Sequence, residues 1–245
     1  MKITVVLPTY NEAENLPKLV SALFSLPLDL SLLVVDDNSP DGTGQIAEEL
    51  SNEYPDKIGI LHRTGKQGLR SAYLEGFRGA FETGADVVVQ MDADFSHDPA
   101  VLMEMARCIE SCEVVIGSRY VKGGSLARRW PLWRKVLSAF GNTYARTILN
   151  IPLHDVTTGY RMWKREALLG IPLDRIRSNG YVFLVEMAYV AFLSGYKIVE
   201  VPIHFKDRRW GKSKMSFRIQ LEAALRIWDV RWHYRNLRKR SRNAN

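Results

Sequence analysis

The chain has 245 residues, of which 46% are hydrophobic and 25% charged, values that are ordinary for a globular protein with a full hydrophobic core. The formal net charge is +7 and the sequence pI is about 9.4, which suggests an anionic partner such as a nucleotide, a phospholipid surface or a nucleic acid. The two cysteines, Cys108 and Cys112, have no accompanying cluster of His or Cys residues. This pattern argues against a zinc site and favours reduced thiols in a cytoplasmic protein.

Short apolar runs alternate with helical patterns along the first half of the chain. We predict strands over residues 3–7, 32–35, 58–61, 87–91 and 114–116. Asn11, with Glu14 three residues later, is expected to cap the first helix. Further helices are expected over residues 43–52, from residue 68 onward and over residues 99–111. Strands that alternate with helices at this spacing predict a mostly parallel, doubly wound α/β sheet.

Pairs of carboxylates follow two of these predicted strands. Asp36 and Asp37 follow the predicted strand over residues 32–35, and Asp92 and Asp94 follow the one over residues 87–91. Ligands of open α/β sheets bind beyond the carboxyl ends of the strands. Two carboxylates this close repel each other unless a positive charge offsets them, and Mg²⁺ or Mn²⁺ does so by bridging carboxylates to substrate phosphates. The alternative for both pairs is a solvated, Asp-rich turn.

Basic and aromatic residues dominate the second half of the chain. We predict helices over residues 132–149, 181–193 and 215–235, a strand pair near 197–205 and a basic loop over 207–214. Arg128, Arg129, Arg134 and Lys135 cluster around Trp130 and Trp133. This segment is either a solvated basic loop or a place where arginines hold a phosphate group.

The last predicted helix has an apolar stripe, and the residues after Asp229 include no acidic residue. An aromatic stripe flanked by arginines suits the surface of an anionic membrane, although the same stripe would also suit a helix that closes the core. The most apolar stretch, residues 20–35, is interrupted and too short to span a bilayer, and no signal peptide is evident. We therefore expect a peripheral protein on the cytoplasmic face of a membrane. The stripe comprises Phe217, Leu221, Leu225, Trp228 and Trp232, and the basic tail contains Arg235, Arg238, Lys239, Arg240 and Arg242.

Eight motifs in one order resemble the family 2 glycosyltransferases and, more narrowly, the dolichol-phosphate or polyprenol-phosphate mannose synthases. The resemblance covers roughly residues 3–215, and the ordered set is more specific than any one motif. The motifs are LPTYNEAENLP (7–17), VVDDNSPDGT (34–43), GLRSAYLEGF (68–77), MDADFSH (91–97), GSRY (117–120), DVTTGYR (155–161), GYVFLVEM (180–187) and VPIHFKDRRWGKSK (201–214).

The resemblance implies a GT-A fold, an α/β fold with a mostly parallel central sheet flanked by helices, here followed by an amphipathic C-terminal helix. It implies an inverting, metal-dependent transfer of a sugar from a nucleotide sugar, with GDP-mannose favoured, to a dolichyl or polyprenyl phosphate. Transfer of glucose, galactose or an N-acetylhexosamine from a UDP-sugar is the alternative. We expect one domain over residues 1–245. In it, residues 1–120 bind the nucleotide sugar, 121–214 bind the acceptor, and 215–245 form the C-terminal helix and basic tail.

The resemblance also assigns roles to individual residues. The nucleotide site comprises Pro8, Tyr10, Glu12, Val35 and Asp37. The sugar-diphosphate site comprises Asp92, Ala93, Asp94 and Ser96, with Asp92 and Asp94 as ligands of Mg²⁺ or Mn²⁺ and Asp94 the more direct one. Arg119, Arg208 and Lys214 meet the donor phosphates or the acceptor, and Arg208 and Lys214 act with the two aspartates in catalysis. Arg134 and Ser138 hold the lipid phosphate together with Arg119, and Glu186 is an acidic position of the acceptor-side helix.

Three positions depart from the pattern of this family. Arg70 replaces the usual Gly, Ser96 replaces a Gln found in some members, and Asn179 replaces a Lys found in some members. These departures bear on the identity of the sugar and leave the reaction class unchanged. Many members continue into membrane-spanning helices, whereas this chain stops at Asn245 without one.

A non-catalytic or nucleic-acid-binding protein is the alternative that the net charge alone would allow. It leaves the carboxylate pairs at 36–37 and 92–94 unexplained, because clustered carboxylates repel a polyanion. We therefore expect a nucleotide sugar, a polyprenyl phosphate and an anionic membrane surface as partners, and no nucleic acid.

Overall fold

The computed structural model describes residues 1–206 and 217–237, with the backbone alone for residues 217–221. The predicted site residues Arg208 and Lys214 lie outside these ranges, as do residues 238–245 of the basic tail.

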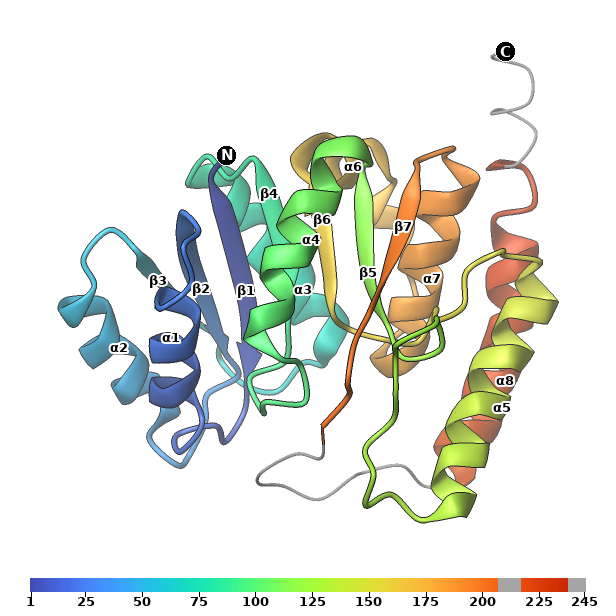
Figure 1. The fold of residues 1–245 in the computed structure, drawn as a ribbon, viewed down its shortest axis with the longest axis horizontal. Helices are drawn as coiled ribbons and strands as arrows, with labels where there is room; N and C mark the ends of the chain where they lie inside the picture. Colours follow the sequence, from blue (N-terminus) through green and yellow to red (C-terminus); the bar gives the residue numbers. More distant parts are fainter. Residues whose placement is uncertain (207–216, 238–245) are drawn as a thin grey trace.

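A seven-stranded sheet forms the centre of the molecule (Figure 1). Its order is β3-β2-β1-β4-β6-β5-β7, and every neighbouring pair is parallel except those that β6 makes with β4 and β5. The central strands are almost continuous runs of buried Val, Ile and Leu, as expected for strands that helices cover on both faces. The strands are β1 (Ile3–Thr9), β2 (Leu30–Asp36), β3 (Ile58–His62), β4 (Val87–Gln90), β5 (Val114–Ser118), β6 (Arg161–Lys164) and β7 (Ile198–Pro202).

Helices cover both faces of this sheet and form two apolar cores with it. Helices α1 (Leu16–Phe24), α2 (Thr43–Glu53) and α4 (Leu102–Cys108) pack on one face. Helices α3 (Leu69–Glu82), α6 (Arg165–Gly170) and α7 (Gly180–Leu193) pack on the other. Helices α5 (Leu132–Leu149) and α8 (Phe217–His233) lie side by side beyond α7, and short 3₁₀ turns occupy Pro99–Val101 (η1), Ile109–Ser111 (η2) and Leu173–Arg175 (η3).

The α/β class, the mostly parallel sheet and the flanking helices are as predicted, but one strand was missed and two local predictions are wrong. The strand β6 was not anticipated, although it lies between β4 and β5 in the sheet. The expected strand pair near residues 197–205 is the single strand β7, parallel to β5. Asn11 does not cap a helix, because it adopts a left-handed conformation with φ of +63° and α1 begins at Leu16.

The C-terminal helix α8 packs through a different face from the predicted stripe. Ile227, Val230 and Tyr234 are buried, whereas Leu225, Trp228 and Trp232 of the stripe are exposed by 68%, 45% and 62%. Hydrogen bonds tie α8 to α5: the Trp228 indole donates to the Tyr144 hydroxyl at 3.0 Å, and that hydroxyl donates to the carbonyl of Ala224 at 3.2 Å. The Tyr234 hydroxyl, just beyond α8, donates to the Glu186 carboxylate at 2.9 Å. Leu225, Trp228 and Trp232 are therefore exposed, while the described part of α8 is fixed to the body of the protein.

Within the described ranges, no helix combines the length and the hydropathy that crossing a bilayer would require.

We predict that Gly76→Ala lowers the free energy of unfolding by about 1–3 kcal/mol, because extra atoms in a close-packed core force neighbours to shift. A Cβ at Gly76 would overlap Cγ1 of Val6 and lie 3.2 Å from Cγ2 of Val35. Gly141→Ala is the matched control, since this exposed α5 glycine has nothing within 4 Å of an added Cβ and alanine favours a helix by about 1 kcal/mol. Urea denaturation measures both changes, and equal stability of the two variants would contradict the packing described for α3.

Candidate active site

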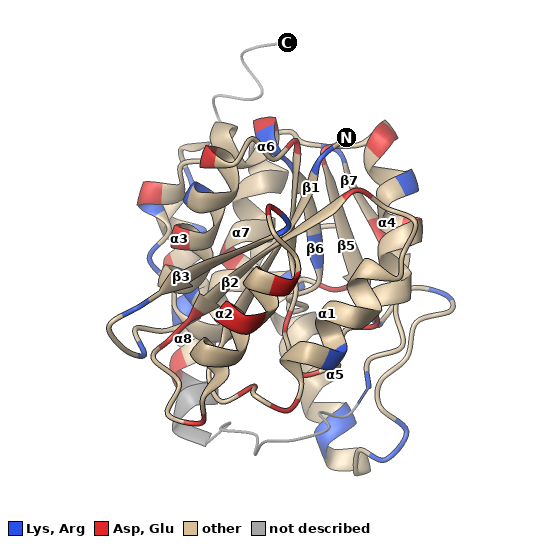
Figure 2. Ribbon diagram, turned by 90° about the vertical axis from the view of Figure 1, so that its left-hand side faces the viewer, with Lys and Arg blue, Asp and Glu red and all other residues tan. Residues whose placement is uncertain are grey.

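The carboxyl ends of the parallel strands β1, β2, β4 and β5 meet at one edge of the sheet, the lower edge in Figure 1. Figure 2 shows acidic residues in the loops at this edge and basic residues around the start of α5. Loops beyond this edge are where open α/β sheets bind ligands. Most of the residues that the sequence singled out lie here.

The loops after β1, β2 and β3 form the part of the edge predicted to bind the nucleotide. Buried Asp37 makes an ion pair with Arg63, whose guanidinium also donates to the Ser71 hydroxyl at 2.6 Å. Burial raises the pKa of Asp37 above its ordinary value, although Arg63 acts to lower it. Lys66 places its ammonium 3.9 Å from the centre of the Tyr10 ring. The Asp37 carboxylate, which Arg63 holds, and the Tyr10 ring therefore both lie in the part of the edge predicted to bind the nucleotide.

The other predicted nucleotide residues differ in how they reach this site. Pro8 is half-buried at the end of β1. Glu12 follows in the next loop, where its carboxylate accepts a hydrogen bond from the Asn15 amide at 2.7 Å. Val35 is fully buried in β2, and its side chain packs in the core, so the structure does not bring it into the group. Arg63 was missed by the sequence analysis, although a cation two residues after a predicted strand was a usable signal.

The acidic loop after β4 is compact and largely buried. Asp94 is 5% exposed, and its Oδ1 accepts the backbone N–H of Ser96 at 3.0 Å. Asp92 is half-buried, and its backbone N–H donates to Nδ1 of His97 at 3.1 Å. Ala93 is buried between the two aspartates, and the buried Ser96 hydroxyl oxygen makes no hydrogen bond with the described residues. The two carboxylates are therefore presented from one tightly held turn.

The charges around this loop affect the pKa of the buried Tyr73 hydroxyl. Burial raises the pKa of Tyr73 well above its ordinary value, and the charges of Asp92 and Asp94 raise it further, while Arg161 acts in the opposite direction. Both carboxylates and one buried guanidinium therefore lie near the same hydroxyl. This hydroxyl belongs to a residue of α3.

The donor set of this loop fits a hard divalent cation. In the described part of the chain, no three His, Cys, Asp or Glu side chains come together as a complete metal site. Two carboxylates at a strand end suit Mg²⁺ or Mn²⁺, ions that keep several waters and take further oxygen ligands from substrate phosphates.

The loop after β5 carries a buried ion pair. Arg119, 9% exposed, donates from Nε and Nη2 to the two oxygens of Asp155 at 2.7 Å and 2.8 Å. Although burial acts against the charged form, Arg119 holds the pKa of Asp155 below its ordinary value, and Asp155 raises that of Arg119. Nη2 also donates to the Thr157 hydroxyl at 2.6 Å. Most of the Arg119 guanidinium is therefore committed to the protein, and Nη1 is the nitrogen that donates no hydrogen bond to the described residues.

Tyr120 connects this loop to α5. Its hydroxyl and that of Ser138 are 2.8 Å apart and hydrogen-bonded. Arg134 lies one helical turn before Ser138, and its guanidinium stacks 3.9 Å from the centre of the Trp130 ring without a hydrogen bond to the described residues. The structure thus brings Arg119, Arg134 and Ser138 to one region through Tyr120, a residue that the sequence analysis left unassigned although it belongs to the GSRY motif.

Glu186 lies in the interior of the protein. It is 1% exposed and accepts hydrogen bonds from the backbone N–H of Ser178 at 2.8 Å and from the Tyr234 hydroxyl at 2.9 Å. Its contacts hold the loop before α7 and the end of the α8 segment, which is a structural role.

Arg70 and Asn179, two of the residues that depart from the family pattern, contact each other. Nε of Arg70 donates to the side-chain oxygen of Asn179 at 3.1 Å, and Nη1 donates to the carbonyl of Ile176 at 2.7 Å. These bonds join the start of α3 to the loop before α7.

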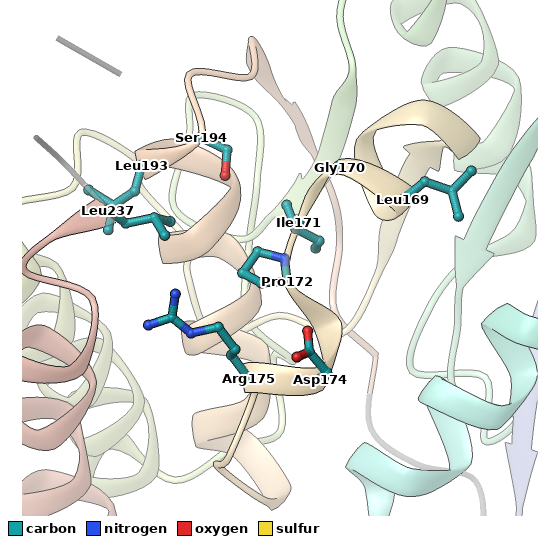
Figure 3. Close-up of a pocket in the computed structure, with 9 residues that line it drawn as sticks. All are labelled: Leu169, Gly170, Ile171, Pro172, Asp174, Arg175, Leu193, Ser194 and Leu237. Carbon is teal, nitrogen blue, oxygen red and sulfur yellow. The ribbon is translucent and has the colours of Figure 1, made fainter. Parts of the chain in front are cut away.

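A separate cavity of about 600 Å³ lies between η3 and the end of α7 (Figure 3). It contains none of the predicted site residues, and its charged lining is Asp174 and Arg175. We assign no role to it.

Comparison with known proteins gives one consistent result. The family described as "Glycosyl transferase family 2" matches residues 4–170. The chain is 44% identical to a polyprenol monophosphomannose synthase of Mycolicibacterium smegmatis over 93% of this chain and 86% of the relative. It is 43% identical to an undecaprenyl-phosphate mannosyltransferase of Micrococcus luteus over 98% and 99%. The fold is similar to that of a Pyrobaculum calidifontis mannosyltransferase solved with GDP-Man and Mn²⁺, with a TM-score of 0.58 at 18% identity over 99% of this chain and 75% of that one.

Asp155→Asn should lower the free energy of unfolding at pH 7 by about 3–5 kcal/mol, because it leaves the buried Arg119 guanidinium without a counter-charge. A carboxyl whose pKa is depressed in the folded state stabilises it above its unfolded pKa of about 3.9, and that contribution is lost as the pH falls through the folded value. Acidification should therefore destabilise the wild type more than the variant. Urea denaturation between pH 7 and pH 3 measures this difference. Exposed Asp174→Asn is the control, and parallel pH curves for Asp155→Asn and the wild type would contradict the assigned ion pair.

Proposed function

The chain belongs to glycosyl transferase family 2 and is a glycosyltransferase, and from this premise we propose that it transfers mannose from GDP-mannose to a polyprenyl phosphate. The observation that carries the proposal is the pairing, at one edge of the sheet, of the acidic loop at Asp92–Asp94 with the cluster of Arg134 and Ser138. Mannosyl transfer is favoured over glucose, galactose or N-acetylhexosamine transfer from a UDP-sugar because both relatives at 43–44% identity are named for mannose transfer.

A phosphate acceptor explains why the site can work without a dedicated general base. A sugar hydroxyl must lose a proton to become a good nucleophile, whereas a lipid phosphate is already ionised near neutral pH. Its oxygen forms the new bond to the anomeric carbon on the face opposite the leaving diphosphate, and the bond from that carbon to the diphosphate breaks, which inverts the configuration. What the acceptor requires from the protein is placement by cations and hydroxyls.

Asp92 and Asp94 would hold Mg²⁺ or Mn²⁺. When bound, such a cation neutralises charge on the diphosphate leaving group. Asp94 is the more direct ligand in the proposal, and the buried Ser96 hydroxyl lies beside it without a hydrogen bond to the described residues. Asp37 and Tyr10 would hold the nucleoside with Pro8 and Glu12. Arg208 and Lys214, outside the described residues, would add positive charge at the diphosphate.

On the acceptor side, the Arg134 guanidinium lies over the Trp130 ring and makes no hydrogen bond with the described residues, and Ser138 offers a hydroxyl one turn later. A planar guanidinium binds two phosphate oxygens at once, which fixes orientation as well as position. Arg119 lies next to Tyr120 and would contribute its remaining N–H groups.

The surface around the start of α5 supports contact with a membrane. Trp133 and Phe140 are 66% and 65% exposed, with Leu132 and Val136 also exposed on the same helix. Arg128 and Arg129 are exposed just before it. Aromatic and apolar side chains flanked by arginines bind at the interface of an anionic leaflet. The exposed residues of α8 would extend this surface, because α8 lies alongside α5.

The test of the proposal is a donor screen with undecaprenyl phosphate as the acceptor. GDP-mannose is compared with UDP-glucose, UDP-galactose and UDP-N-acetylglucosamine, with Mn²⁺ or with a chelator. We expect acceptor-dependent release of GDP and formation of mannosyl lipid, both abolished by the chelator. Turnover of a UDP-sugar in place of GDP-mannose would establish the alternative, and release that does not depend on the lipid would refute a polyprenyl phosphate acceptor.

Asp94→Asn should lower kcat by about 100-fold or more while leaving the melting temperature within a few degrees, because an amide supplies neither the charge nor the metal affinity of a carboxylate. The matched control is Asp98→Asn in the same loop, whose carboxylate pairs with Lys206 and where Asn can still accept the Ala100 N–H. Steady-state mannosyl transfer measures both variants. Full activity of Asp94→Asn in the presence of a chelator would exclude the proposed metal role.

Arg134→Ala should raise KM for undecaprenyl phosphate by about 10- to 100-fold, because it removes a charge-assisted hydrogen bond to the acceptor. It should change KM for GDP-mannose far less. Arg78→Ala removes an exposed charge on α3 and serves as the control. If both substrates were affected equally, Arg134 would not be an acceptor residue.

The double variant Trp133→Gln, Phe140→Gln should weaken binding to anionic vesicles at least about 10-fold, since burial of each large apolar side chain contributes about 1.5–3 kcal/mol. Its melting temperature should hardly change, because both side chains are exposed. Leu169→Gln, on α6 and also exposed, is the control for a surface apolar residue elsewhere. Vesicle co-sedimentation measures binding, and unchanged binding of the double variant would move the contact away from α5.

A further inference from the structure

The acidic loop after β4 contains a backbone conformation that requires support. Phe95, between Asp94 and Ser96, has a φ of +62°. A bulky residue rarely adopts this left-handed conformation, and it persists only where surrounding contacts hold it. The turn that presents the two carboxylates is therefore not the shape that the chain would take by itself.

His97 closes this turn from its far end. Its Nδ1 accepts the backbone N–H of Asp92 at 3.1 Å, which joins the first acidic residue to the last residue of the turn. To accept this hydrogen bond, Nδ1 must carry a lone pair and no proton. The imidazole is 1% exposed, so the bond is shielded from competing water.

The imidazole ring is itself held in place by two aromatic residues. Tyr160 stacks on it with centroids 4.8 Å apart and an interplanar angle of 14°, and Phe205 meets it edge-on at 6.0 Å. The Tyr160 hydroxyl also donates to the carbonyl of Asp98 at 2.9 Å, directly after the turn. The position of Nδ1 is therefore fixed from outside the loop, by residues that precede β6 and follow β7.

We propose that His97 is a positioning residue for Asp92 and Asp94. Its Nδ1 lone pair fixes the Asp92 backbone and, through the turn, the direction of the Asp94 carboxylate before a divalent cation and a nucleoside diphosphate bind. The proposal rests on the proposed function for the identity of those ligands. His97 acts through the aspartates and touches no reacting atom.

Two substitutions separate this role from simple packing. His97→Asn keeps an oxygen acceptor at the δ position, whereas His97→Leu keeps apolar volume and has no acceptor. Both lose the ring contacts with Tyr160 and Phe205, so the melting temperature of the metal-free protein should fall by a similar amount in each. If His97→Leu does not fold, His97→Gln takes its place, since its amide lies at the ε position and leaves the δ position without an acceptor.

The readout is calorimetric titration of the full chain with GDP in the presence and absence of Mn²⁺, together with kcat for mannosyl transfer. We expect His97→Leu to weaken Mn²⁺-dependent GDP binding about 10- to 100-fold, the range found when a residue that orients a metal ligand is lost. His97→Asn should stay within about 3-fold of the wild type. The control is Phe24→Leu, which breaks the ring pair of Phe24 with Tyr54 in another part of the molecule and shows what a loss of stability alone does to binding.

Equal weakening in His97→Leu and His97→Asn would overturn the proposal, because the ring contacts and not the acceptor would then matter. Mn²⁺-dependent GDP binding by His97→Leu that is as tight as that of the wild type would overturn the proposal as well. If the wild-type protein binds GDP without any dependence on Mn²⁺, the proposed metal role of Asp92 and Asp94 fails first, and the inference fails with it.

Discussion

The mutual repulsion of Asp92 and Asp94 is the constraint on which much of this structure depends. Both lie at the end of β4, and Asp94 is almost fully buried. Two carboxylates held close together repel each other unless positive charge is supplied from elsewhere. Arg161 of β6 is fully buried, burial lowers its pKa to about 10, and its charge acts on the same Tyr73 hydroxyl as the two aspartates. An inserted antiparallel strand thus brings a buried cation toward an acidic loop from which it is far apart in sequence.

The same strand organises the acceptor side. The segment leading into β6 carries Asp155, which binds Arg119, and Tyr160, which stacks on His97. One segment therefore sets the geometry of both the acidic loop after β4 and the cationic loop after β5. An oxygen of the lipid phosphate is itself the nucleophile, so the protein has only to hold it in line with the leaving group. Catalysis by positioning the substrates and stabilising their charges requires a fixed arrangement of this kind.

Sequence patterns predicted the features that local physics determines. Val-rich runs such as Val87–Val89 identified the central strands, and the bounds of α5 were predicted as residues 132–149, as observed. Features that depend on distant contacts were not predictable. Strand β6 is four residues long with a cation at each end, and only tertiary contacts bury Arg161. The face of α8 that packs, the interior place of Glu186 and the support of His97 likewise depend on neighbours that no spacing along the chain encodes.

The central claim is that one edge of the sheet holds a metal-bound nucleoside diphosphate at Asp94 and a lipid phosphate at Arg134 and Ser138. A crystal structure of the protein with Mn²⁺, GDP and a short-chain polyprenyl phosphate tests it most directly. The account predicts Mn²⁺ in direct contact with the Asp94 carboxylate and with GDP phosphate oxygens, and the lipid phosphate within hydrogen-bond distance of the Arg134 guanidinium and the Ser138 hydroxyl. Mn²⁺ bound away from the loop after β4, or a lipid phosphate bound away from α5, would contradict it.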